Sequence, residues 1–150
     1  MPQSLAQIYV HIIFSTKNRE RLISDPVRPE LHSYMATILS NWESPALLIN
    51  SVHDHIHVLC MLSKNYAVKK IVEEAKKGAS KWIKTKGEPY AGFHWQDGYG
   101  AFSVSPSKLE DVKQYIANQE EHHRRVSFQE EFRAFLKKYN VEFDERFVWD

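Results

Sequence analysis

Three histidines occupy alternate positions in a short apolar segment of the chain. His53, His55 and His57 lie in "SVHDHIHVLCML", and in a β-strand every second side chain points to the same face. Two such imidazoles stand roughly 6–7 Å apart at the backbone, so both can reach one metal ion. Imidazole binds Zn, Mn, Fe or Ni, and it accepts Mg when oxygen ligands complete the shell. The pattern is therefore typical of a metal site, although histidines packed in a core give the same spacing.

A second pair of candidate residues lies near position 115. Tyr115 and Gln119 are four positions apart in "LEDVKQYIANQEEHHRR", which places both side chains on one face of a helix. A glutamine oxygen can complete the ligand set of a metal without adding negative charge, so an anionic phosphate can still approach. A tyrosine can attack a phosphodiester that a metal polarises, and the phosphotyrosine formed conserves the energy of the broken bond without ATP. Alternatively, Tyr115 is a core aromatic and Gln119 an exposed helix former.

The composition predicts one soluble globular domain over residues 1–150. The chain has 150 residues, 43% hydrophobic and 26% charged, which is ordinary for a folded domain. Its single cysteine, Cys60, excludes an internal disulfide and favours a reducing, cytoplasmic location. No signal-peptide pattern opens the sequence, and no apolar run approaches the ~18–20 residues that span a bilayer.

Positive charge is concentrated in one segment, although the formal net charge is only +1. Residues 64–86 contain eight lysines and two glutamates. Such a lysine-rich segment can contact phosphates, or it can simply be the solvated face of a helix.

The hydrophobic periodicity alternates between strand and helix patterns. We predict strands at 6–16, 45–52, 55–62 and 100–105, helices at 26–43, 66–85, 107–124 and 128–139, and an extended tail at 141–150. The second and third strands are close enough to form a hairpin that turns at His53–Asp54. This order predicts an α+β fold: an antiparallel sheet with helices on one face, ferredoxin-like (βαββαβ) with additional C-terminal helices.

His55-Ile56-His57 followed some 60 residues later by Tyr115-x-x-x-Gln119 resembles the single-tyrosine HUH transposases of small bacterial insertion sequences, the IS200-like transposase family. The resemblance extends over nearly the whole chain, through "YVHIIFSTKNRERL", "DHIHVL", "WQDGYGAFSVS", "YIANQEEHH" and "DERFVW". The joint pattern is much more specific than either half.

The resemblance implies a metal-dependent endonuclease and strand transferase that cleaves and rejoins single-stranded DNA at hairpin-bearing element ends. It implies that Tyr115 is the nucleophile of a 5′-phosphotyrosine intermediate, and that His55, His57 and Gln119 bind Mg²⁺ or Mn²⁺. It also implies a homodimer in which each active site takes its histidines from one subunit and its tyrosine from the other. Candidate DNA contacts are Lys17, Arg19, Arg21, Lys76, Lys77, Lys81 and Lys84.

Two other functions fit the residues. A zinc-dependent hydrolase could use His53, His55 and His57 as its three ligands, or the chain could be an inactive relative that only binds hairpin nucleic acid. Asp54 can orient an imidazole or form the hairpin turn. We expect His122 and His123 to interact with the C-terminal dipole of their helix, rather than with metal or DNA.

Overall fold

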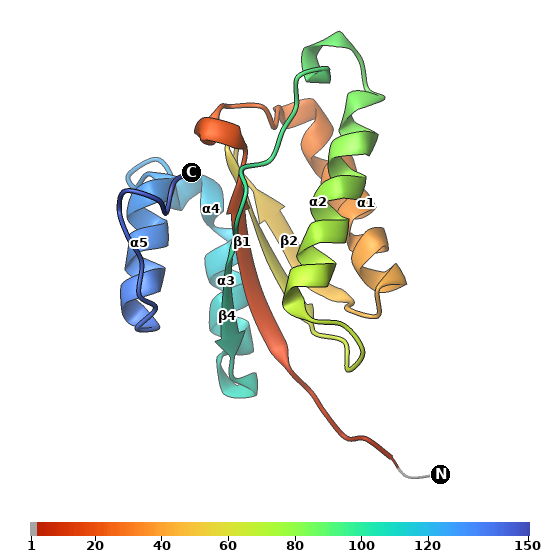
Figure 1. Cartoon of the computed structure of the whole chain (residues 1–150), viewed down its shortest axis with the longest axis vertical. Coiled ribbons are helices and arrows are strands. Elements are labelled where there is room, and N and C mark those ends of the chain that lie inside the picture. Colours follow the sequence, from red (N-terminus) through yellow and green to blue (C-terminus); the bar gives the residue numbers. More distant parts are fainter. Residues whose placement is uncertain (1–2) are drawn as a thin grey trace.

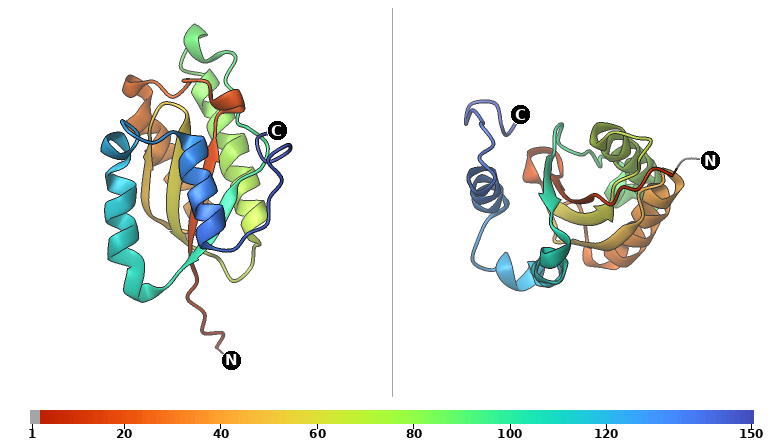
Figure 2. Two further views of the ribbon diagram at one scale, coloured as in Figure 1. Left: turned by 90° about the vertical axis from the view of Figure 1, so that its left-hand side faces the viewer. Right: turned by 90° about the horizontal axis from the view of Figure 1, so that it is seen from below.

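A computed structural model describes residues 3–150 as one four-stranded antiparallel sheet with helices on both faces (Figure 1). The strand order is β2-β3-β1-β4. The strands are β1 (Tyr9–Ser15), β2 (Ala46–Ser51), β3 (His55–Met61) and β4 (Gly100–Val104). This is the strand order of a ferredoxin-like sandwich, so the predicted α+β fold class is confirmed. The prediction of helices on one face is wrong, because the C-terminal helices cover the other face (Figure 2).

Two long helices connect the strands and cover one face of the sheet. They are α1 (Arg28–Asn41) and α2 (Val68–Lys84). Their buried residues recur every three or four positions, as expected for helices packed along one stripe: Leu31, Met35 and Leu39 in α1, and Ile71, Val72, Ala75, Ala79 and Ile83 in α2. Short 3₁₀ turns occur in the loops: η1 (Lys17–Arg19), η2 (Asp25–Val27), η3 (Glu88–Tyr90) and η4 (Pro106–Lys108). No helix in the described part of the chain is long and apolar enough to cross a membrane.

The C-terminal helices lie on the opposite side of the sheet from α1 and α2 (Figure 2). They are α3 (Leu109–Ala117), α4 (Gln119–His122) and α5 (Phe128–Lys138). The predicted uninterrupted helix over 107–124 is wrong, because the backbone leaves helical geometry at Asn118 (φ −93°, ψ 21°). Asparagine competes for backbone hydrogen bonds and is a poor residue for a helix interior.

Alternation along β1 and β3 gives the sheet two chemically different faces. The residues directed to α1 and α2 are apolar: Val10, Ile12, Phe14, Ile56, Val58 and Cys60. The other face carries three buried histidines, His11, His55 and His57, beside Ile13 and Leu59. Strand register places Ile13 opposite His57 and Ser15 opposite His55. The predicted hairpin is confirmed, because β2 and β3 pair antiparallel and are joined by a turn at residues 52–54.

The last residues form turns and pack against α5. The predicted extended tail is wrong beyond Asp144, because the amides of Phe147 and Val148 donate to the Asp144 carbonyl over 3.0 and 2.8 Å. The Asp144 side chain also accepts a hydrogen bond from the Arg146 amide at 2.8 Å, a local contact by which aspartate favours turns. The Trp149 ring lies 6.0 Å from that of Phe132, so the tail packs against the N-terminal half of α5.

Candidate metal and nucleophile site

A buried carboxylate lies among three histidines on the face of the sheet that carries His55 and His57, which we call the site face. The Oε1 atom of Glu131 is 2.9 Å from His57 Nε2, 3.3 Å from His55 Nε2 and 3.2 Å from His123 Nε2. The ligand atoms of all four residues lie within 4.8 Å of one another. We call these residues the His₃Glu cluster. Strand β3 supplies two of its members, while the segment around α4 and helix α5 supply the other two.

A second partner holds each imidazole of the cluster on its far side. His55 Nδ1 lies 2.7 Å from Asp54 Oδ1 and His57 Nδ1 lies 2.8 Å from His11 Nε2. His123 Nδ1 donates to the Val126 carbonyl at 2.5 Å. Partners of this kind fix the orientation of metal-binding histidines. Asp54 therefore takes the orienting position that was one of its two predicted roles.

Tyr115 lies against the cluster within the same chain. Its hydroxyl donates to Glu131 Oε2, the carboxylate oxygen that does not face the three imidazoles, and lies 3.3 Å from His122 Nε2. The Tyr115 ring centroid is 5.9 Å from that of His57. Tyr115 and Glu131 also line a cavity of about 910 Å³ between α3 and α5, so an extended ligand has space to approach the hydroxyl.

Gln119 is fully buried next to Tyr115. Its Nε2 donates to the Tyr115 carbonyl at 3.2 Å, and its Oε1 has no hydrogen-bond partner among residues 3–150. An unsatisfied buried acceptor costs roughly 1–3 kcal/mol and calls for an explanation. A bound cation would provide the missing partner, so Gln119 fits its predicted role as a metal ligand, which stays a prediction.

The surroundings of Tyr115 keep its hydroxyl protonated at neutral pH. Burial raises the pKa of Tyr115 well above its ordinary value, and the charge and hydrogen bond of Glu131 raise it further. A hydrogen bond from Gln119 acts in the opposite direction and is the weaker effect. For this tyrosine to act as a nucleophile, a neighbouring group must accept its proton, and the Glu131 carboxylate already accepts its hydrogen bond.

The cluster holds a charged carboxylate among imidazoles, and the pKa values of His55 and His57 are shifted in opposite directions. Burial opposes ionisation of Glu131, but hydrogen bonds from His123, His55 and His57 outweigh it, so the pKa of Glu131 lies well below its usual range. Burial lowers the pKa of His57 to about 4 and that of His11 to about 3. The pKa of His55 is raised, because hydrogen bonds to Asp54 and Glu131 outweigh its burial.

Comparison with known proteins identifies the family. The sequence model described as "Transposase IS200 like" matches residues 4–119, which is well over half of the chain. The chain belongs to the IS200-like transposase family. The match ends at Gln119, so His123 and Glu131 of this transposase lie beyond the matched residues.

Solved structures share the fold of this IS200-like transposase. A candidate transposase from Deinococcus radiodurans is 20% identical with a TM-score of 0.62, covering 79% of this chain and 98% of the other. A REP-associated tyrosine transposase bound to a REP hairpin is 13% identical with a TM-score of 0.59, covering 84% of this chain and 74% of the other. A search of curated proteins gave no match.

His53 lies outside the cluster. Its Nδ1 accepts a hydrogen bond from Arg21 at 2.8 Å, and its Nε2 is 3.1 Å from Asp25 Oδ1. Both ring nitrogens are therefore engaged near the surface. The alternative prediction of a zinc site formed by His53, His55 and His57 is wrong in its third ligand, because the third imidazole of the cluster comes from His123.

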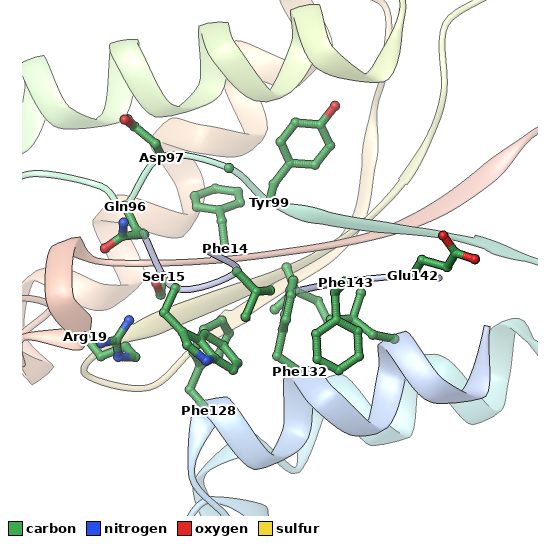
Figure 3. A pocket seen from close by; sticks show the side chains of 15 residues that line it. Phe14, Ser15, Arg19, Gln96, Asp97, Tyr99, Phe128, Phe132, Glu142 and Phe143 are labelled. Atoms are coloured by element: carbon green, nitrogen blue, oxygen red, sulfur yellow. The ribbon is translucent and has the colours of Figure 1, made fainter. Parts of the chain in front are cut away.

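The predicted DNA contacts near the end of β1 lie close to the site. Arg19 lines a cavity of about 230 Å³ and lies 5.9 Å from the ring of Trp149. Figure 3 shows this cavity, with Phe128 and Phe132 of α5 facing Ser15 and Arg19. Lys17 is exposed beside it, and Arg21 donates to His53. Contacts of Lys17, Arg19 and Arg21 with DNA stay predictions.

The predicted contacts on α2 lie on the opposite side of the sheet from the cluster. Lys77, Lys81 and Lys84 are exposed there. Lys76 differs from them, because its ammonium donates to the carbonyls of Gln96 and Gly98 at 2.8 and 2.5 Å. Burial lowers its pKa to about 8. Lys76 therefore holds the loop before β4, whereas DNA contacts by the four α2 lysines stay predictions.

The sequence patterns did not indicate His11 or Glu131 as neighbours of Tyr115 and His57, and they favoured a different role for His123. Glu131 had a signal, because it lies at an apolar position of the helix "FQEEFRAFL", between the buried residues Phe128 and Phe132. A carboxylate on the buried side of a helix needs a compensating partner. We expected His123 to interact with the C-terminal dipole of its helix, but its side chain points into the cluster instead.

Proposed function

We propose that this IS200-like transposase cleaves and rejoins single-stranded DNA, with Tyr115 as nucleophile and a divalent metal ion held by His55, His57 and Gln119. One observation carries the proposal: the Tyr115 hydroxyl donates to a carboxylate whose other oxygen contacts His57 and His55. The candidate nucleophile therefore faces a cavity and is joined through Glu131 to the buried histidines, in a chain of the transposase family.

The reaction is a transesterification at phosphorus. The Tyr115 oxygen bonds to the phosphorus of a phosphodiester, and the bond between phosphorus and the 3′-oxygen breaks. The product is a 5′-phosphotyrosine and a free 3′-hydroxyl. The Tyr115 proton passes to Glu131, whose Oε2 already accepts its hydrogen bond, and the departing 3′-oxygen takes up one proton, so the protons balance. A bound metal supplies Lewis-acid polarisation of the scissile phosphate. Attack of a 3′-hydroxyl on the phosphotyrosine reverses the step and rejoins a strand.

The proposed cofactor is Mg²⁺ or Mn²⁺, and the proposed partner is single-stranded DNA with hairpin ends. A protein of the same fold was solved bound to a REP hairpin, which supports hairpin recognition here. Arg19 and Lys17 lie at the end of the strand that carries His11 and offer positive charge near the site. A DNA substrate also fits the cytoplasmic location that the use of cysteine predicts.

The arrangement of Tyr115 bears on the predicted dimer. The resemblance implies a homodimer with shared sites, but Tyr115 and His57 are already neighbours within one chain. We therefore propose that a single chain holds a complete site, with the homodimer kept as a separate prediction. Sedimentation of the active protein tests the dimer, and cleavage by a species that sediments as a monomer would exclude obligatory sharing.

The test of the function is covalent attachment to DNA. An oligonucleotide that carries the hairpin-forming DNA next to the gene is incubated with protein and Mn²⁺ or Mg²⁺, then resolved on a denaturing gel. We expect a protein–DNA adduct that Tyr115→Phe abolishes. Tyr139→Phe is the matched control, because Tyr139 lines the same cavity but is not among the partners of Glu131. An adduct that persists in Tyr115→Phe would refute the assignment of the nucleophile.

A further inference from the structure

We propose that His123 and Glu131 are metal ligands in addition to His55, His57 and Gln119, so that three imidazoles and one carboxylate dominate the donor set and the centre prefers Mn²⁺ or Zn²⁺ to Mg²⁺. Both added ligands lie beyond the residues that match the family, which end at Gln119. The inference deepens the proposed function, because it specifies the metal centre of the same site. It is tested by metal binding alone and can therefore fail independently.

The spacing of the donor atoms suits one ion. With metal–ligand bonds of about 2.1 Å, adjacent ligands of an ion stand roughly 3.0 Å apart in octahedral and 3.4 Å apart in tetrahedral geometry. In the cluster, Glu131 Oε1 stands 2.9–3.3 Å from the three Nε2 atoms. The Nε2 atoms of His55 and His123 are 3.0 Å apart. The side chains thus already stand at distances that ligands of one ion adopt.

The outer hydrogen bonds determine which nitrogen of each ring carries the proton. The Val126 carbonyl only accepts, so His123 must hold its proton on Nδ1. The Asp54 carboxylate, whose Oδ1 lies 2.7 Å from His55 Nδ1, is an acceptor as well. In the neutral forms of these two rings, both Nε2 atoms therefore present lone pairs toward each other and toward Glu131 Oε1. A metal ion placed between these three acceptors would be bound by all of them at once.

His57 is compatible with the same state. Its Nδ1 can donate to His11 Nε2, 2.8 Å away, which leaves its own Nε2 free to bind metal. Each of the three imidazoles then has its Nδ1 fixed by an outer partner and its Nε2 directed at one point, an arrangement that orients metal-binding histidines.

The charge of the cluster also favours a cation. Glu131 is almost completely buried, and its ion-pair partners among residues 3–150 are all histidines. Neither lysine nor arginine pairs with the carboxylate in the described structure, so histidines alone offset its buried charge. A divalent ion between Oε1 and the imidazoles would neutralise it.

The donor types indicate which metals bind. Imidazole favours Zn and the later transition metals, Mn is shared between nitrogen and oxygen ligands, and Mg prefers oxygen and water. A set with three nitrogens and one carboxylate oxygen thus disfavours Mg²⁺. The second oxygen of Glu131 meanwhile accepts from Tyr115, so the same side chain positions the nucleophile beside the metal.

The experiment measures metal bound to the purified full chain, without DNA. Protein freed of metal is dialysed against Mn²⁺, Zn²⁺ or Mg²⁺ over a range of concentrations, and bound metal is measured by mass spectrometry. We expect Glu131→Gln and His123→Ala each to weaken Mn²⁺ binding at least about 100-fold, more than loss of a supporting partner does. Wild type should bind Mg²⁺ at least about 100-fold more weakly than Mn²⁺, given its nitrogen-rich donor set.

Matched controls separate ligand loss from damage to the fold. Glu130→Gln makes the same change one residue earlier, at an exposed side chain of the same helix, and His94→Ala removes an exposed histidine. Both should bind Mn²⁺ like wild type. Thermal melts without metal check folding, and Mn²⁺ should raise the melting temperature of wild type and both controls but not of Glu131→Gln.

Two results would overturn the inference. One is Mn²⁺ binding by folded Glu131→Gln and His123→Ala that equals that of wild type, and the other is equal affinity of wild type for Mg²⁺ and Mn²⁺. Either result leaves the proposed nuclease intact if Tyr115 still forms the DNA adduct. Conversely, loss of metal in both variants with no adduct in any protein supports the ligands and refutes the nuclease.

Discussion

The two faces of the sheet are built from the same strands and differ in almost everything else. Toward α1 and α2, strand β3 presents Ile56, Val58 and Cys60, which pack into one continuous apolar core. Toward α3 and α5, the same strand presents His55, His57 and Leu59. On this second face the apolar side chains form two smaller clusters that are separate from each other, and the buried His₃Glu cluster lies on the same face.

The difference separates stability from chemistry. The face toward α1 and α2, the core face, buries apolar side chains between the sheet and these two helices. Burial of apolar surface is the dominant source of folding free energy. The site face buries a carboxylate and several imidazoles, which is unfavourable unless each is paired. We infer that the first face stabilises the fold, and that the second uses part of that stability to hold polar groups away from water.

Neighbouring substitutions in β3 provide the strongest test of this contrast. His57→Ala should lower the rate of DNA cleavage roughly 10³-fold, the scale lost with one electrostatic stabiliser of a transition state. Its cost in unfolding free energy should be only about 1–2 kcal/mol. Ile56→Ala should do the reverse and cost about 2–5 kcal/mol. Denaturant melts measure the unfolding free energy, and single-turnover cleavage by the folded fraction measures the activity. If His57→Ala and Ile56→Ala lost similar activity per folded molecule, the two faces would not differ in function as we infer.

Two glycines offer a smaller steric test, one on each face. A Cβ at Gly100 would lie 2.7 Å from Phe132 Cε2, whereas one at Gly78 would lie 2.6 Å from Ile38 Cδ1. Each alanine should cost about 1–3 kcal/mol through overpacking, less any gain in helix propensity at Gly78. Only Gly100→Ala should displace α5 and reduce the rise in melting temperature caused by Mn²⁺. A full metal effect in Gly100→Ala would mean that α5 does not hold the centre.

The smallest expected effect concerns a histidine of α1, outside the cluster. Burial, with a smaller contribution from the Arg28 charge, lowers the pKa of His32 to about 4. Between pH 6.5 and about 4 the unfolded chain therefore binds a proton that native His32 does not, so stability falls as pH falls through this window. In His32→Gln, the loss of unfolding free energy between pH 6.5 and about 4 should be smaller by on the order of 1 kcal/mol, after allowance for the partial exposure of His32.

Urea melts at several pH values measure the slope, and DNA cleavage serves as the companion readout. His32 Nε2 lies 2.7 Å from Ser51 Oγ and touches no member of the cluster. Cleavage at neutral pH should therefore be unchanged in His32→Gln. An unchanged slope would show that His32 is protonated equally in the folded and unfolded chains.

Local patterns predicted most of the fold. The alternation in β1 and β3 and the helical spacing of α2 gave the right elements in the right order, because each period reflects burial on one face. The break at Asn118 and the turned tail were missed, since both depend on a few hydrogen bonds rather than on periodicity. The cover of the site face by α5 also depends on tertiary packing, which strand and helix periods do not encode.

The site was predictable only where its residues are close in sequence. His55 and His57 share a strand face, and Tyr115 and Gln119 are one helical turn apart, so spacing alone pairs them. Glu131 lies 74 residues after His57 in the sequence and meets the histidines only when α5 docks. Its apolar surroundings in the helix were the available clue, but they could not identify its partners.

The central claim is that Tyr115, which lies against the histidine-bearing face of the sheet, forms a covalent bond to DNA. The most direct measurement is peptide mapping of the trapped adduct: nuclease trimming, proteolysis and mass spectrometry of the peptide that contains residues 114–124. The account predicts that this peptide carries a 5′-phosphorylated nucleotide on Tyr115, in wild type but not in His57→Ala. A nucleotide on another residue, or DNA cleaved with no covalent adduct at any time, would contradict it.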